Sequence, residues 1–159
     1  MDTKEGVVTR LLIMDIPDEL RNLDFETYDA ISALVVPEKK GEIISITALI
    51  EEEVTKAIAG DTEPSKTLLK KSLSDKIKSL ESRFGGIEGH EQEKKEVLAF
   101  LRALLEIRNL GAHSYGVGFA DLAQLEEDHP GTKHLLSECP KNLWAAVKLF
   151  NSNMLSIKT

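Results

Sequence analysis

Apolar residues recur every three or four positions along most of the chain, and this spacing constrains the fold more than any other feature. A period of this length places apolar side chains on one face of an α-helix, whereas a half-buried strand needs strict alternation. Clean alternation over strand lengths is hard to find, and the aromatic residues that favour sheets make up only 5% of the chain. The sequence therefore predicts an all-α protein, an up-and-down bundle of four to six helices.

The predicted helices are separated by prolines, glycines and short polar segments. Helices are expected over residues 7–13, 28–36, 42–59, 67–83, 91–110 and 121–127, and again after Pro140. A break is expected over residues 37–41, because proline disfavours the helical conformation in the residue before it and glycine allows a turn. We expect Gly60 to end the helix over 42–59, and Ser65 or Thr67 to cap the helix over 67–83.

The length of 159 residues favours a single domain over residues 1–159. The chain is 42% hydrophobic and 30% charged, which excludes a disordered or collagen-like protein. Cys139 is the one cysteine and has no partner for an internal disulfide, which is typical of a reducing compartment such as the cytoplasm. No apolar run approaches the roughly 18 to 20 residues of a membrane span, so no membrane association is expected.

The formal net charge of −7 means that the molecule as a whole repels nucleic acid, so any RNA contact has to be local. One segment, residues 66–83, has a local charge of +4, because six basic residues outnumber Asp75 and Glu81. The basic residues are Lys66, Lys70, Lys71, Lys76, Lys78 and Arg83. Two interpretations stay open for this segment: a solvated helix face, which is what such charge runs usually form, and a local RNA contact.

Arg108 is the anomaly of the longest predicted helix. It falls near the centre of the apolar arc, within about 40° of both Val97 and Leu104 on a helical wheel. A guanidinium stays charged there, so it requires a carboxylate, backbone carbonyls or a polar cleft. One interpretation is a structural arginine paired with Glu51 or Glu53, which flank the apolar stripe of the helix over 42–59.

His113 follows Arg108 by five residues. In an unbroken helix the two side chains diverge by about 140° and are separated by about 7.5 Å along the axis, so one segment does not aim both at one phosphate. A helix break at Gly111 removes this divergence. Alternatively, a two-fold homodimer with this segment facing its own copy brings two arginines and two histidines into one cleft.

The stretch Glu106-Ile107-Arg108-Asn109-Leu110-Gly111-Ala112-His113-Ser114-Tyr115 resembles the signature motif of the HEPN superfamily, which consists of small domains of four to five helices. The version with four residues between Arg and His, and Tyr two positions later, is similar to toxins that pair with minimal nucleotidyltransferase antitoxins. Roughly residues 42–116 resemble the family core, with helical extensions on both sides.

The resemblance implies a metal-independent endoribonuclease that works as a homodimer on single-stranded RNA, as a toxin or defence effector. His113 would then be the general acid and base, and Arg108 would stabilise charge on the phosphate. Asn109 would shape the site, and Tyr115 would be a residue that an antitoxin modifies. Glu51 would add a carboxylate, with Glu53 as the alternative. These roles suit the side chains, because a neutral imidazole accepts a proton near pH 7 and a guanidinium matches phosphate oxygens.

A second resemblance supports a different function. The stretch Leu73-Ser74-Asp75-Lys76-Ile77-Lys78-Ser79-Leu80 and the following Gly85-Gly86-Ile87 are similar to the related mannitol-operon regulator group. By this resemblance the chain would be a non-catalytic transcriptional regulator or protein-interaction module. Its Arg108 and His113 would then hold a helix junction together, and its partner would be a regulatory protein.

No cofactor or metal is expected from the remaining motifs. His90-Glu91 lacks the second histidine, four positions on, of a helical zinc site, and Gly85-Gly86 lacks the Gly-Lys-Ser/Thr of a phosphate-binding loop. His129 and His134 have no nearby thiols, and Cys139 has no evident activating base.

Overall fold

The computed structural model describes residues 25–112 and 118–158, and all regular structure in these ranges is helical. Within them the helices are α2 (Phe25–Val35), α3 (Pro37–Ala59), α4 (Lys66–Lys70), α5 (Leu73–Gly85), α6 (Glu91–Ala112), α7 (Phe119–Asp128), α8 (Thr132–Leu136) and α9 (Lys141–Lys158). The all-α prediction is confirmed. Two of these helices, α4 and α8, have only five residues each. The helix predicted over 7–13 lies outside the described residues.

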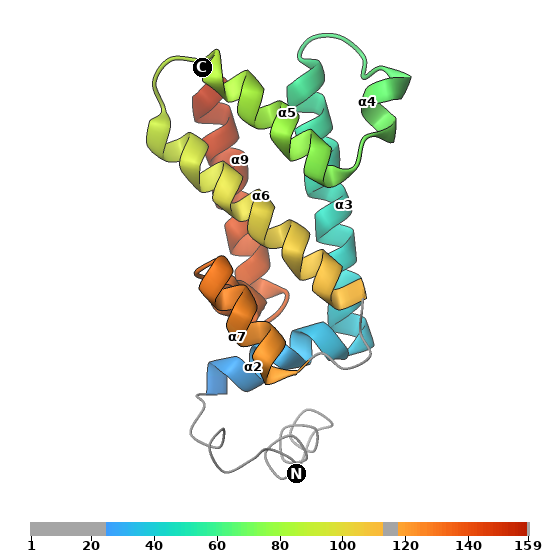
Figure 1. The fold of residues 1–159 in the computed structure, drawn as a ribbon, viewed down its shortest axis with the longest axis vertical. Helices are drawn as coiled ribbons and strands as arrows, with labels where there is room; N and C mark the ends of the chain where they lie inside the picture. Colours follow the sequence, from blue (N-terminus) through green and yellow to red (C-terminus); the bar gives the residue numbers. More distant parts are fainter. Residues whose placement is uncertain (1–24, 113–117, 159) are drawn as a thin grey trace.

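The long helices pack around α6, which crosses the middle of the molecule (Figure 1). In this view the chain runs up α3, returns through α4, runs up α5, then down α6 and finally up α9. Helix α6 packs against α3, α5 and α9, and its last turns reach the end of the molecule where α2 lies across the bundle. None of the described helices is long and apolar enough to cross a membrane.

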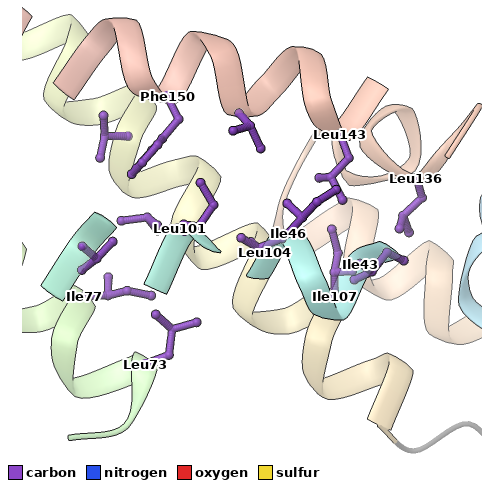
Figure 2. Packing of buried hydrophobic residues seen from close by; sticks show 14 of the residues in the cluster. Ile43, Ile46, Leu73, Ile77, Leu101, Leu104, Ile107, Leu136, Leu143 and Phe150 are labelled. Carbon is purple, nitrogen blue, oxygen red and sulfur yellow. The ribbon is translucent and has the colours of Figure 1, made fainter. Parts of the chain in front are cut away.

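The core is built from the apolar stripes that the helical spacing predicts. Leu101, Leu104 and Ile107 of α6 have no exposed surface, and Figure 2 shows them among side chains of α3 and α9. The stripe of α3 is buried in the same cluster, as are residues of α2, α5, α7 and α8. Burying a leucine or isoleucine side chain contributes about 1.5 to 3 kcal/mol, so this cluster is the main source of stability.

The break predicted over residues 37–41 is wrong in extent. Only Val36 is extended, with φ −77° and ψ 122°, and α3 begins directly at Pro37. Proline suits the first helical position, because its missing N–H has no partner there and its φ is already helical. Gly41 continues the helix. Gly60 ends it as predicted, with φ 67°.

The single helix predicted over 67–83 is two helices joined by an extended corner at Lys71 and Ser72. Each helix has its own serine cap: the Ser65 hydroxyl accepts a hydrogen bond from the Leu68 amide, and the Ser72 hydroxyl accepts one from the Asp75 amide, both at 3.1 Å. The apolar spacing from Leu68 continues across the corner, so periodicity alone did not separate the two helices.

Helix α8 has no counterpart among the sequence-based predictions. Its five residues are too few for a helical period to be visible. Leu136 is fully buried, and α8 packs against α2 and α9. The segment therefore adds Leu136 to the core next to α2 and α9.

Replacement of Leu101 by alanine tests the central role of α6. The Leu101→Ala variant is expected to lower the free energy of unfolding by about 2 to 5 kcal/mol, because it leaves a cavity in a fully buried site. The control is Leu69→Ala on α4, whose side chain is 57% exposed and whose loss is expected to cost less than about 0.5 kcal/mol. Denaturant unfolding measures both, and equal losses would contradict this description of the core.

Candidate functional site

Arg108 lies in the last turns of α6 and is half-buried, with 35% of its side chain exposed. Its Nη1 is 3.9 Å from Oε2 of Glu51 on α3, which is an ion-pair contact too long for a hydrogen bond. Of the two glutamates expected as partners, Glu51 makes this contact, while Glu53 pairs with Lys56 on its own helix at 3.5 Å. The guanidinium therefore has a carboxylate neighbour and is still open to solvent.

The stronger partner of Glu51 is Lys76, in the first turns of α5. The Lys76 Nζ donates a hydrogen bond to Glu51 Oε1 at 3.0 Å, and only 5% of the Lys76 side chain is exposed. A buried ammonium needs such a carboxylate, because taking its charge out of water is otherwise expensive. Lys76, Glu51 and Arg108 thus form one charge array across α5, α3 and α6.

The charge array has two cations and one carboxylate, so it has a net formal charge of +1. Each Glu51 oxygen faces a different cation: Oε1 faces Lys76 at 3.0 Å and Oε2 faces Arg108 at 3.9 Å. Lys76 is buried and makes the 3.0 Å hydrogen bond, whereas Arg108 is half-buried and makes the 3.9 Å contact. The uncompensated positive charge is therefore accessible at Arg108, where an anion is able to approach.

The buried position of Lys76 corrects one expectation for the basic segment 66–83. The other five basic residues are exposed, in agreement with a solvated face, but Lys76 belongs to the interior. A signal was present in the sequence, since Lys76 lies three residues after Leu73 and four before Leu80. It therefore falls on the apolar stripe of α5.

An apolar cavity of about 180 Å³ lies next to Arg108, where the end of α2, the start of α3 and the end of α6 meet. The residues that line it are Leu34, Lys40, Ile43, Ile44, Ile107, Arg108, Gly111 and Ala112. Six of these are apolar or lack a side chain, and two are cations. Sequence reasoning did not identify Lys40 or this cavity.

The remaining predicted site residues are Asn109, His113 and Tyr115, and of these the structure describes Asn109. Asn109 is exposed on α6 beside Arg108. His113 and Tyr115 lie outside the described residues, so the Arg108-to-His113 geometry stays a prediction. The helix continues through Gly111 to Ala112, so the break considered at Gly111 does not occur.

The other described histidines are His90, His129 and His134, and the cysteine is Cys139. No group of three or more His, Cys, Asp or Glu side chains gathers within the described residues in a way that would hold a metal ion. His134 Nδ1 lies 3.7 Å from Glu26 Oε2 at an exposed position. Burial raises the pKa of the Cys139 thiol, which lowers its thiolate fraction and hence its reactivity.

Comparison with known proteins gives no match: no protein-family model, no curated protein and no solved structure resembles this chain at a significant level.

Paired substitutions test the unequal roles of the two cations. We expect Lys76→Met to lower the free energy of unfolding by about 2 kcal/mol, because it removes a charged hydrogen bond from a buried site. Arg108→Met is expected to cost less than about 1 kcal/mol, since its contact is longer and solvent-exposed. Denaturant unfolding measures both variants. A larger loss for Arg108→Met would mean that Arg108 is primarily a structural partner of Glu51.

Proposed function

We propose that this protein is a HEPN-type, metal-independent endoribonuclease that cuts single-stranded RNA as a homodimer, in the manner of a toxin or defence effector. The observation that supports this proposal best is the environment of the Arg108 guanidinium. This guanidinium is half-buried but open, and the nearby Glu51 is already hydrogen-bonded to Lys76. Donors that a purely structural arginine would use internally are therefore available to a phosphate.

In the proposed reaction, the neutral His113 imidazole accepts the proton of a ribose 2′-hydroxyl. The 2′-oxygen then forms a bond to the adjacent phosphorus, and the bond from phosphorus to the 5′-oxygen of the next nucleotide breaks. A histidinium returns a proton to that leaving oxygen, so the products are a cyclic phosphate and a 5′-hydroxyl. Arg108 stabilises the negative charge that develops on the phosphorane oxygens.

The other residues have supporting roles in this proposal. Glu51 orients Arg108, and the short hydrogen bond from Lys76 holds Glu51 in place on α3. Asn109 is exposed beside Arg108 and shapes the entrance of the site. Tyr115 would be the residue that an antitoxin modifies to silence the enzyme.

A second function, a non-catalytic regulator or protein-interaction module, is favoured by three exposed apolar side chains of α9. Leu149 and Leu155 are 55% and 66% exposed, and Trp144 is 39% exposed on the same helix. Apolar side chains of this size on a surface are typical of protein interfaces. In this alternative, the charge array only joins α3, α5 and α6.

Cleavage of a single-stranded RNA in the presence of a chelator separates the two functions. We expect wild-type cleavage, with a loss of about 100-fold or more for His113→Ala and for Arg108→Met, because each removes a group that acts on the transition state. Arg102→Met is the matched control, since Arg102 is an exposed arginine on the same helix and pairs with Glu81. Its rate is expected to equal the wild-type rate.

Two results would contradict the nuclease proposal. Equal cleavage by all four proteins would identify a contaminating nuclease, and no cleavage by any of them would favour the interaction module.

The homodimer has its own test. Because Arg108 and His113 are five residues apart in the sequence, the proposed site is completed by the two residues of both copies across a two-fold axis. Light scattering is expected to give twice the mass of the 17.6 kDa chain. A monomer at the concentration where RNA is cleaved would contradict a shared site.

A further inference from the structure

We propose that the cavity beside Arg108 is a nucleotide subsite, which takes one base of a single-stranded RNA while Lys40 and Arg108 hold the adjoining phosphate. This inference rests on the proposed function and adds to it how the substrate strand is held. The cavity has a volume of about 180 Å³ and lies at the corner formed by α2, α3 and α6. Of the charge array, only Arg108 lines this cavity, while Lys76 and Glu51 do not.

The walls of the cavity suit an uncharged, flat group. Leu34, Ile43 and Ile107 are buried at 0%, 4% and 0% exposure, and Ile44 is 61% exposed. These four aliphatic side chains offer no hydrogen-bonding group to an ion or to water. A nucleobase that no longer stacks on its neighbouring bases gains favourable free energy when its face packs between such apolar side chains.

The two cations that line the cavity, Lys40 and Arg108, supply positive charge that is complementary to a phosphate. Among the described residues, Lys40 makes no ion pair, and Arg108 has only the 3.9 Å contact with Glu51. A base and its phosphate are joined through one ribose, so a ligand with an apolar body and an adjoining anion matches this arrangement. Phosphate contacts by lysine and arginine dominate the affinity of most nucleic-acid sites.

A larger side chain at Gly111 would fill the cavity while Lys40 and Arg108 stay unchanged. Gly111 lies in α6 and lines the cavity, and a Cβ built on it would meet no heavy atom within 4 Å. A leucine at this position is therefore expected to fill the cavity rather than to displace the backbone. Gly85→Leu is the matched control, because Gly85 is a helical glycine of α5 that does not line the cavity, and a Cβ built on it also meets no heavy atom within 4 Å.

The test is binding of a short 2′-O-methyl single-stranded RNA to the full chain, measured by fluorescence anisotropy at low salt. The 2′-O-methyl group blocks cleavage, so binding is measured separately from catalysis. Wild type is expected to bind this probe about tenfold more tightly than an abasic strand of the same length. Gly111→Leu, Lys40→Met and Arg108→Met are each expected to weaken binding by about tenfold or more.

Two controls are expected to bind like the wild type: Gly85→Leu, and Lys148→Met at an exposed position of α9. Thermal melting checks that every variant is folded. Wild-type binding by folded Gly111→Leu or Lys40→Met would overturn the subsite, as would equal affinity for the abasic strand or no binding of the probe by wild type. Displacement of the probe by octanoate but not by a nucleoside monophosphate would assign the cavity to acyl carboxylates and also overturn it.

The outcomes distinguish this inference from the proposed function. If the binding pattern is as expected and wild type does not cut RNA, the nuclease proposal fails and the nucleotide subsite stands. If wild type cuts RNA and folded Gly111→Leu binds and cuts equally well, the nuclease proposal stands and the subsite fails.

Discussion

The burial of one face of α6 is the constraint on which the rest of the structure depends. Leu101, Leu104 and Ile107 have no exposed surface, and the helix packs against α3, α5 and α9. Because these contacts fix both the axis and the rotation of α6, they also fix where its last turns lie. Arg108 follows Ile107 directly, so the core determines the position of the guanidinium.

Much of the fold was predictable because helical periodicity reports burial directly. The stripe expected for α3 is buried, and Gly60 ends that helix with a positive φ of 67°, which suits glycine. The corner at Ser72 was missed for a physical reason: the apolar spacing continues across it, while the information lies in one serine hydroxyl that caps α5. Helix α8 was missed because five residues are too short to show a period.

The candidate site was predictable in part, from a conflict between charge and position. Arg108 on an apolar arc required a carboxylate, backbone carbonyls or a polar cleft, and Glu51, one of the two glutamates considered, lies 3.9 Å away. Lys76 was not recognised, because lysines in a basic run are normally solvated and only its place on the stripe of α5 distinguishes it. The cavity was invisible in the sequence, since it forms where the ends of three distant segments meet. The role of His113 stays a prediction.

The position of Ile107 couples the shape of the cavity to the stability of the fold. This single side chain belongs to the core of α6 and is also a wall of the cavity beside Arg108. Replacing Ile107 with a smaller residue would enlarge the cavity and also destabilise the helix bundle. The shape of the cavity therefore cannot change at this position without a loss of stability. A change in the shape of this cavity without loss of stability is therefore expected at Ile44, which borders it from the surface, and at Lys40.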